Sequence, residues 1–354
     1  MFYRENGQFK TSYEADQALF PIAQDRVFIV LVLLVAFVGI PLLADEYMFR
    51  AILIPFLILS LAAVGLNILV GYCGQISLGT GGFMMVGAYA AYNLAVRVPE
   101  LNILVVFVLA GLITTVVGMI FGIPSLRIKG LYLAVATLAA QFFLDWLFSR
   151  VKWFTNDSSS GSVSAPVLQM FGFRWESPLE KYLFVLSVVA LFSLIARNLV
   201  RSHIGRSWMA TRDMDIAAEI IGIRPVYAKL SAFAVSSFIV GIAGALWGFV
   251  HLGSWEPLAF DVNRSFSLLF MVIIGGLGSI LGSFLGAAFI VILPLLLNQI
   301  PLWLGLPMST ATAAHFEAMI FGALIIFFLI VEPHGLARLW AIAKEKLRLW
   351  PFPH

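Results

Sequence analysis

Residues 265–298 read SFSLLFMVIIGGLGSILGSFLGAAFIVILPLLLN, a stretch of apolar and small residues without a charged side chain. A helix that crosses a bilayer needs about 20 mainly apolar residues, so this stretch is too long for one crossing. The segment GGLGS at 275–279 divides it, because glycine clusters favour turns over helices. The stretch therefore predicts a short helix over 265–277, a glycine turn, and a full membrane helix over 280–298.

Other apolar runs of membrane-spanning length recur along the chain. They are continuous instead of alternating, which is typical of membrane helices and not of membrane β-barrels. Together with the two helices above, they predict an all-α polytopic membrane helix bundle of about ten transmembrane helices, with a lower bound of about eight. The clear runs lie near 27–44, 50–70, 101–123, 130–149, 181–199, 230–250 and 315–332, and a weaker Gly- and Ala-rich run covers 80–96.

The composition argues against a water-soluble protein. Hydrophobic residues make up 61% of the 354 residues and charged residues 12%, compared with roughly 25% charged residues in a soluble globular chain. The net charge of +3 comes without a basic block interleaved with aromatic residues, which argues against a nucleic-acid partner. The single cysteine, Cys73, excludes an internal disulfide and a cysteine-based metal cluster, and we expect it to be a small packing residue.

The distribution of Lys and Arg predicts that both termini face the cytoplasm. Most of these residues then fall on the inner side, in a tail over 1–26, a loop over 200–229 and a basic tail over 333–354. The transmembrane domain covers 27–332, and we expect its first helix to be retained, because no basic, acid-poor signal region precedes it. The Gly- and Ser-rich outer loop over 150–180 is expected to form a partly flexible cap.

Signatures of catalysis are missing from the sequence. It contains no G-x-x-x-x-G-K-[ST] phosphate loop, no H-E-x-x-H motif and no G-x-S-x-G nucleophile elbow. The five histidines are scattered and have no metal-ligand spacing. We therefore expect no enzyme activity, metal or cofactor on this chain, so that ATP-driven transport would need another chain to bind the nucleotide.

The inner loop over 200–229 reads VRSHIGRSWMATRDMDIAAEIIGIRPVYAK, which is long for a plain turn between membrane helices. Ile216, Ile220 and Ile223 recur at the spacing that places residues on one face of a helix. Two interpretations remain open for this expected helix. It is either an interfacial amphipathic helix that anchors the loop, or a docking helix for a soluble motor protein.

The same loop resembles a known protein family. I-G-R at 204–206, followed by D-x-x-x-A-A-E-x-x-G-I at 213–223, is similar to the coupling loop of permease subunits of bacterial ABC importers. More narrowly, the chain resembles the LivM-type permeases of the high-affinity branched-chain amino acid importers. Supporting stretches occur in family order across 60–340: GYCGQISLG (71–79) with GAY (87–89), LRIKGLYLAVATLA (126–139), IIGGLGSILGSFLGAA (273–288) and EPHGLARL (332–339).

This resemblance implies a permease subunit for ATP-driven uptake of leucine, isoleucine and valine across the bacterial inner membrane. Related permeases carry urea, short amides or small organic acids, so the exact substrate stays open. The implied partners are a second permease subunit, two cytoplasmic ATPase subunits that bind ATP and Mg²⁺, and a periplasmic solute-binding protein. A helix over 206–223 would transmit movement, and the coupling residues implied are Gly205, Arg206, Asp213, Ala217, Ala218, Glu219 and Gly222.

Three positions depart from the family pattern. Thr80 stands where the family often has a histidine after S-L-G. Phe142 and Asp145 stand where it often has a glutamate and a basic residue. These positions fall where helices can line a pore, so the departures put the exact substrate in doubt and leave the fold unaffected.

Two segments of broken backbone, over 71–79 and 275–279, are candidates for the translocation path. Non-helical backbone at membrane depth is tolerated where it is buried or lines a cavity. The alternative is that both are plain cytoplasmic turns. Acids inside apolar runs are also candidates, although Asp145 and Glu317 lie close enough to helix ends to reach interfacial water. The candidate path residues are Gln75, Ser77, Thr80, Asp145, Gly275, Gly276 and Glu317.

Small residues repeat at helical spacing at Gly278, Gly282 and Gly286. This spacing lets membrane helices pack closely, either within the chain or against a second permease subunit. A stand-alone secondary transporter would need coupling-ion chemistry within the membrane and, commonly, related halves. Two marginal acids and no visible repeat argue against that class, and the missing catalytic cluster argues against a membrane enzyme or scaffold.

Overall fold

The computed structural model describes the chain from residue 23 to 349 with gaps, plus residues 11–12. The described ranges are 11–12, 23–126, 131–158, 161–166, 168–170, 173–303, 319–320, 322–324, 326–328, 330 and 335–349. Expectations for Glu317 and for half of the run over 315–332 lie outside these residues.

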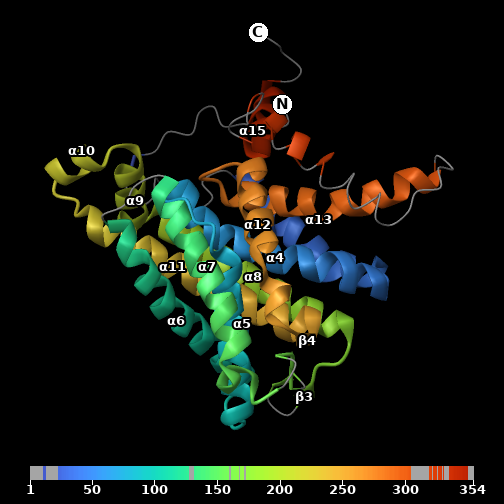
Figure 1. The fold of residues 1–354 in the computed structure, drawn as a ribbon. Coiled ribbons are helices and arrows are strands. Elements are labelled where there is room, and N and C mark those ends of the chain that lie inside the picture. Colours follow the sequence, from blue (N-terminus) through green and yellow to red (C-terminus); the bar gives the residue numbers. More distant parts are fainter. Residues whose placement is uncertain are drawn as a thin grey trace.

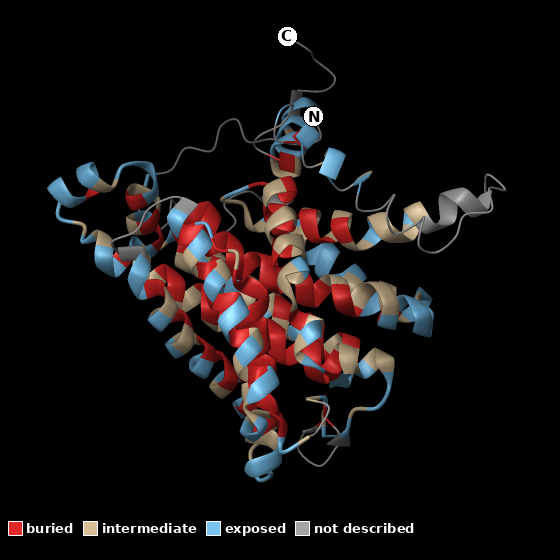
Figure 2. Ribbon diagram, viewed as in Figure 1, coloured by how far each residue is buried: buried red, intermediate tan, exposed pale blue. Residues whose placement is uncertain are grey.

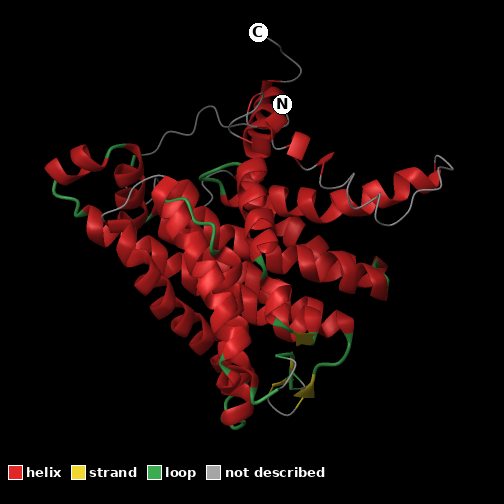
Figure 3. Cartoon of the chain, viewed as in Figure 1, coloured by secondary structure: helices red, strands yellow, loops and turns green. Residues whose placement is uncertain are grey.

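The described chain is almost entirely helical, as Figure 3 shows. The long helices are α2 (Ala23–Leu34), α4 (Ile54–Asn67), α5 (Thr80–Arg97), α6 (Ile103–Gly122), α7 (Leu131–Arg150), α8 (Pro178–Arg201), α9 (His203–Asp213), α11 (Pro225–Leu246), α12 (Val262–Gly275), α13 (Ile280–Trp303) and α15 (Gly335–Leu349). Shorter helices are α3 (Ile40–Leu43) and α10 (Asp215–Ile220), with π-helical turns η1 (Val35–Gly39), η2 (Met48–Leu53), η3 (Ile68–Tyr72) and η6 (Trp247–Leu252) and 3₁₀ turns η4 (Ile123–Leu126), η5 (Lys152–Thr155) and η7 (Pro257–Phe260).

Among the described residues, eight helices are long and apolar enough to cross a membrane. They cover Arg26–Leu43, Met48–Tyr72, Ile103–Gly122, Tyr132–Arg150, Pro178–Arg201, Pro225–Leu252, Pro257–Gly275 and Ile280–Leu297. Each corresponds to an expected run, and α5 matches the weaker run over 80–96 as a helix that is not one of these eight. The polytopic all-α class is confirmed, with eight such helices where about ten were expected.

Two helices, α4 and α11, form the centre of the bundle, where buried residues concentrate in Figure 2. α11 packs against α4, α5 and α6. Its close approach to α5 depends on glycine, because a Cβ on Gly87 would collide with the Gly241 backbone and one on Gly244 with the Met84 backbone. Small residues at such contacts let dispersion forces act over short interhelical distances, which is the main source of packing energy in a lipid environment.

At the starts of two helices, a side chain accepts a hydrogen bond from a free backbone N–H group. The Asn102 side chain accepts a hydrogen bond from Leu104 N at the start of α6, and Asp261 accepts one from Arg264 N at the start of α12. Such N-caps are typically worth about 1 kcal/mol each. The caps explain why these helices begin at the observed residues.

Described residues of the outer loop over 150–180 make specific contacts, and the partly flexible cap expected there stays a prediction. Strand β1 (Val163–Ser164) pairs antiparallel with β4 (Ser254–Trp255), and β2 (Gln169–Met170) pairs with β3 (Phe173–Arg174). The Asn93 side chain donates to the Phe154 carbonyl at 2.9 Å. In Figure 1, β3 and β4 lie at one end of the molecule, while α9, α10 and α15 lie at the other.

Candidate functional site

The 200–229 loop forms a helical hairpin that projects from the bundle as α9 and α10 (Figure 1). The expectation of one helix over 206–223 is wrong. Met214 adopts an extended conformation (φ −159°, ψ 98°) between the two helices, and Gly222 ends the hairpin with φ +88°. Since positive φ is strained for side chains with a Cβ, Gly222 suits this turn for a conformational reason.

The tip of the hairpin carries apolar side chains that no part of the described chain covers. Met214 is 63% exposed, Ile216 68%, Ile220 81% and Ile221 73%. A group of exposed large apolar residues on a projecting element is typical of a protein–protein contact. Ile223, which was expected on the same face, is half-buried.

The base of the hairpin is packed tightly. Trp208 is fully buried, and its Nε1 donates to Ser231 Oγ at 2.9 Å. A Cβ on Gly205 would collide with the Val200 carbonyl, so this glycine allows the sharp corner between α8 and α9. Ala218 is also buried. Among the implied coupling residues, Gly205 and Ala218 therefore support the hairpin from inside.

The other implied coupling residues lie on its surface. Arg206 donates from Nη1 to the Arg201 carbonyl at 3.1 Å. Asp213 pairs with Arg212, whose Nη2 lies 2.8 Å from Oδ1. The exposed coupling residues are Arg206, Asp213, Ala217, Glu219 and Gly222.

Arg212 fastens the hairpin to the membrane bundle. Its Nη1 donates to the Gly71 carbonyl at 2.8 Å, in the π-helical turn that ends the α4 segment. A Cβ on Gly74 would lie 2.8 Å from Arg212 Cγ, so the arginine side chain lies directly on the broken backbone. The sequence analysis missed Arg212, because charged residues in cytoplasmic loops are common and carry no spacing signal.

The two segments of broken backbone meet at Asn67. This buried residue accepts a hydrogen bond from Gly278 N at 2.9 Å and donates to the Ser279 carbonyl at 2.8 Å and to Ser283 Oγ at 2.9 Å. A Cβ on Gly71 would collide with Asn67 Oδ1 and Gly278 N, so the two segments are in contact. The sequence signal that could have predicted this contact is a single asparagine inside the apolar run over 50–70, because a buried amide needs hydrogen-bond partners.

Two helices, α5 and α12, begin next to the middle of α7. The Gly81 N–H donates to Ser265 Oγ at 2.7 Å, and the Gly82 N–H donates to Gln141 Oε1. Gln141 Nε2 donates to the Phe260 carbonyl at 2.9 Å, just before α12. Because Gln141 is near the midpoint of α7, both helix starts lie beside the middle of that helix, an arrangement that also occurs in transporters with discontinuous helices.

Apart from Asp145 and Glu317, the predicted path residues lie in or next to the two segments of broken backbone. Gln75, Ser77 and Thr80 are all buried, and among the described residues Gln75 Oε1 and Thr80 Oγ1 have no hydrogen-bond partner. Leu78 N donates to Thr137 Oγ1 at 2.9 Å, which places this part of the segment over 71–79 beside α7.

Asp145 lies one helical turn beyond Gln141 and is half-buried. Its Oδ1 accepts a hydrogen bond from Gln141 Nε2 at 3.4 Å, so its carboxylate is adjacent to the starts of α5 and α12. Phe142, the other departure on α7, is exposed on the outer face of the helix at 57%. Of the two departures on α7, Asp145 is therefore the one that lies near the polar centre of the bundle, where Thr80 also lies at the start of α5.

The glycine turn joins α12 and α13 closely. Gly275 and Gly276 are buried, and a Cβ on Gly275 would collide with the Gly282 carbonyl, while one on Gly286 would collide with the Met271 carbonyl. Gly278 differs from the expectation of a packing stripe, since it lies in the turn with φ +74°. Of the three glycines expected in the packing stripe, Gly282 and Gly286 make the close α12–α13 contact.

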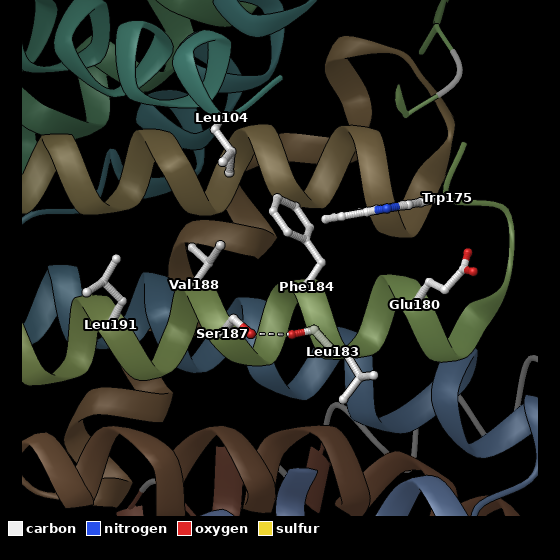
Figure 4. Close-up of a pocket in the computed structure, with 8 residues that line it drawn as sticks. All are labelled: Leu104, Trp175, Glu180, Leu183, Phe184, Ser187, Val188 and Leu191. Atoms are coloured by element: carbon white, nitrogen blue, oxygen red, sulfur yellow. Dashed lines mark hydrogen bonds between the residues drawn. The ribbon is translucent and has the colours of Figure 1, made fainter. Parts of the chain in front are cut away.

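A cavity of about 530 Å³ lies on the outside of the bundle, between α6, α8 and the outer loop (Figure 4). Ser187 donates its hydroxyl to the Leu183 carbonyl at 2.8 Å, so this lining residue has no unused donor. Glu180 is the only charged residue lining it and accepts from Ser177 N at the start of α8. This mostly apolar groove is separate from the polar residues described above. It is lined by Leu104, Trp175, Glu180, Leu183, Phe184, Ser187, Val188 and Leu191.

Within the part of the chain that the structure describes, no group of three His, Cys, Asp or Glu residues is arranged to hold a metal ion. The functional features are therefore an exposed apolar hairpin, its attachment to broken helices, and a buried polar centre.

Comparisons with known proteins place these features in one family. The family described as "Branched-chain amino acid transport system / permease component" matches residues 48–329. The high-affinity branched-chain amino acid transport system permease protein LivM of Salmonella typhimurium is 28% identical over 77% of this chain and 66% of its own length, and that of Escherichia coli is 27% identical over the same shares. The chain thus spans just under two-thirds of these two relatives.

More distant relatives are transport permeases as well. The probable branched-chain amino acid transport permease protein LivM of Methanocaldococcus jannaschii is 26% identical over 73% of this chain and 76% of its own length. The autoinducer 2 import system permease protein LsrC of Yersinia enterocolitica is 27% identical over 50% of this chain and 49% of its own length. No solved structure matches.

Proposed function

The chain belongs to the family of branched-chain amino acid transport permease components, and on that premise we propose that it is the permease subunit of an ATP-driven importer of branched-chain amino acids. The observation that carries the proposal is the α9–α10 hairpin. Its tip exposes Ile216, Ile220 and Ile221, and its base is attached to broken membrane helices through Arg212. This arrangement suits a surface on which a soluble motor pushes.

Movement of the hairpin reaches the bundle through named contacts. Arg212 holds the Gly71 carbonyl, and Asn67, four residues earlier, holds the turn at Gly278 and Ser279. A displacement of α9 would therefore act on the ends of both α4 and α12. Since packed interfaces have discrete alternative arrangements, such a displacement can switch the bundle between inward and outward access.

The proposed partners follow from the same arrangement. Two ATPase subunits dock on the hairpin side, where they bind Mg²⁺ and hydrolyse ATP, and a periplasmic solute-binding protein docks at the end that carries β1–β4. A second permease subunit completes the pore. We place the chain in the bacterial inner membrane as a multi-pass protein with both termini in the cytoplasm, since the hairpin carries Arg201, Arg206 and Arg212.

Reconstitution tests this proposal against its alternatives. The chain is purified with its ATPase and second permease subunits, placed in liposomes with the solute-binding protein, and assayed for uptake of radiolabelled leucine. We expect uptake that needs ATP and the ATPase subunits. Uptake of leucine by this chain alone, driven by an ion gradient, would instead establish a secondary transporter. Uptake of urea, acetamide or isovalerate but not leucine would establish one of the other substrate classes.

A further inference from the structure

An arginine lies inside a membrane-spanning helix at the polar centre of the bundle. Arg264 is the third residue of α12, within the candidate span Pro257–Gly275. Its guanidinium carbon lies 4.6 Å from the centre of the Trp247 ring, which belongs to η6 at the end of α11. Because a charged side chain at membrane depth is costly, such a residue is a functional candidate unless its charge is fully compensated.

One hydrogen-bond donor of each residue in this pair is not used within the described chain. Arg264 Nε and Trp247 Nε1 are both buried, and neither has a hydrogen-bond partner among the described residues. Trp247 is only 4% exposed. Buried donors in folded proteins nearly always have an acceptor, so two neighbouring donors without one indicate a missing acceptor. Both groups can only donate, which makes an anion the fitting ligand.

The site can be reached from outside the bundle. Arg264 as a whole is half-buried although its Nε is buried, and its neighbour Asn263 is exposed. Both residues stand in the first turn of α12, where an exposed polar side chain can meet a polar path or a subunit contact. Leu268 and Met271, one and two turns further along the same face as Arg264, are buried, so this face of α12 points into the bundle.

Two nearby carboxylates limit which kinds of anionic ligand this site can bind. Asp261 Oδ1 accepts from Arg264 N at 3.0 Å, and Asp261 Oδ2 accepts from Asn263 Nδ2 at 2.7 Å, so this carboxylate is already used as a helix cap. Asp145 lies close enough to Asp261 for their charges to interact. Asp261 interacts with Arg264, and Asp145 adds a second negative charge next to Asp261. A simple organic acid is therefore disfavoured, whereas a ligand that also carries an ammonium group is favoured.

We propose that Arg264 and Trp247 form the binding site for the carboxylate of a zwitterionic amino acid on its way through the membrane. A guanidinium group offers a planar fork of donors that matches a carboxylate, and the indole N–H adds a third donor. Asp145 and Asp261 supply the negative field that selects for an α-ammonium group. This inference rests on the proposed function and deepens it, since it selects amino acids over urea, amides and simple acids.

Equilibrium binding of radiolabelled leucine tests the site. The complete transporter complex is embedded in lipid nanodiscs without the solute-binding protein, so that only binding to the membrane part is measured. We expect leucine to bind the wild-type complex and to be displaced by unlabelled leucine. Leucinamide, which lacks the carboxylate, and isovalerate, which lacks the ammonium group, are expected to compete at least about tenfold more weakly, the scale of one lost charged hydrogen bond.

Substitutions distinguish the effect of losing a hydrogen-bond donor from the effect of losing side-chain packing. Arg264→Gln is expected to weaken leucine binding by about tenfold or more, and Arg264→Lys by less. Trp247→Phe keeps an aromatic ring and removes only the N–H, so a smaller loss of about threefold to tenfold is expected. Arg97→Gln is the matched control. Arg97 also lies over a tryptophan ring, at 3.7 Å from Trp153, but its Nη2 already donates to the Trp153 carbonyl.

Each outcome decides the inference. Binding of leucine to Arg264→Gln with wild-type affinity would overturn it, as would leucinamide competing as well as leucine. ATP-driven leucine uptake without measurable leucine binding to the wild-type nanodisc complex would overturn the site and leave the proposed function standing. Absence of leucine uptake in the liposome assay would instead overturn the proposed function. Size-exclusion profiles and basal ATPase rates identify variants that do not assemble. If Arg264→Gln is one of these, two other measurements decide: the affinity of Arg264→Lys for leucine, and the competition of leucinamide with leucine for the wild-type complex.

Discussion

Arg212 Nη1 lies 2.8 Å from the Gly71 carbonyl oxygen, and this hydrogen bond joins the α9–α10 hairpin to the end of the α4 segment. The Arg212 side chain is 36% exposed, and the carbonyl belongs to the π-helical turn η3. A hydrogen bond from a charged donor to a backbone acceptor is worth about 1.5–3 kcal/mol. The contact is thus strong enough to make the hairpin and the broken helix move together.

Replacing Arg212 is expected to uncouple ATP hydrolysis from uptake. In Arg212→Ala the ATPase subunits still find the exposed tip of the hairpin, but its movement no longer pulls on Gly71. We expect leucine taken up per ATP hydrolysed to fall by about tenfold, the effect of losing one charged hydrogen bond, and Arg212→Lys to retain part of the wild-type ratio. The ratio is measured in proteoliposomes.

The control for this prediction is Glu46→Gln. It breaks an exposed ion pair with Arg50 (2.7 Å), an interaction worth about 0–1 kcal/mol. Wild-type coupling in Arg212→Ala would mean that the Arg212–Gly71 contact carries no movement.

The turn at Gly222 is expected to be needed for docking but not for folding. Gly222 has φ +88°, and no atom lies within 4 Å of a Cβ built there. Gly222→Trp therefore strains the turn and places a large side chain on the docking surface without entering the core. We expect copurification of the ATPase subunit to be lost, while the size-exclusion profile of the permease in detergent is unchanged.

Gly161 offers a matched comparison. It has φ +71° and equally open surroundings, but lies in the outer loop. Gly161→Trp should retain the ATPase subunit. Retention of that subunit by Gly222→Trp would show that docking uses another surface.

Close packing between α12 and α13 predicts a large stability effect at Gly282. A Cβ there would lie 2.6 Å from the Gly275 carbonyl oxygen and 3.0 Å from the Gly276 carbonyl oxygen. Overpacking of this kind typically costs about 1–3 kcal/mol. Gly282→Leu should lower the thermal unfolding midpoint of the purified permease. Gly322→Leu is the control, since nothing lies within 4 Å of its Cβ position, and equal midpoints for the two variants would refute the close contact.

Cys73 predicts slow reaction with thiol reagents in the native protein. It is 3% exposed, and burial raises the pKa of the Cys73 thiol to about 12. Only the thiolate reacts, and its fraction stays small until pH approaches that pKa, so raising pH from 7 to 9 should leave most of the protein unlabelled. Labelling by a maleimide is followed by intact mass, with full labelling expected in denaturant.

Ile76→Cys in a Cys73→Ala background is the matched control. Ile76 lies in the same segment but is 39% exposed, so its thiol should react rapidly. Complete native labelling of Cys73 at pH 7 would contradict the buried placement of this segment.

The expected helices and the two segments of broken backbone emerged from local patterns. Continuous apolar runs and the glycine cluster at 275–279 report only on neighbouring residues, and these are what set helix formation in lipid. The α9–α10 hairpin was expected as one helix over 206–223, because Ile216, Ile220 and Ile223 satisfy the helical period. Periodicity does not register a single extended residue, so the break at Met214 was missed.

The amino-acid sequence alone thus determined that the chain crosses the membrane many times, where its helices break, and to which family it is similar. Only the tertiary structure decided that Asn67 joins segments more than two hundred residues apart, and that Gln141 receives the starts of α5 and α12. The physical reason is that the hydrophobicity of a segment determines whether it enters the bilayer, but not which other segment it packs against. A buried amide or guanidinium takes whichever partner the packing of glycine-lined helices brings within reach.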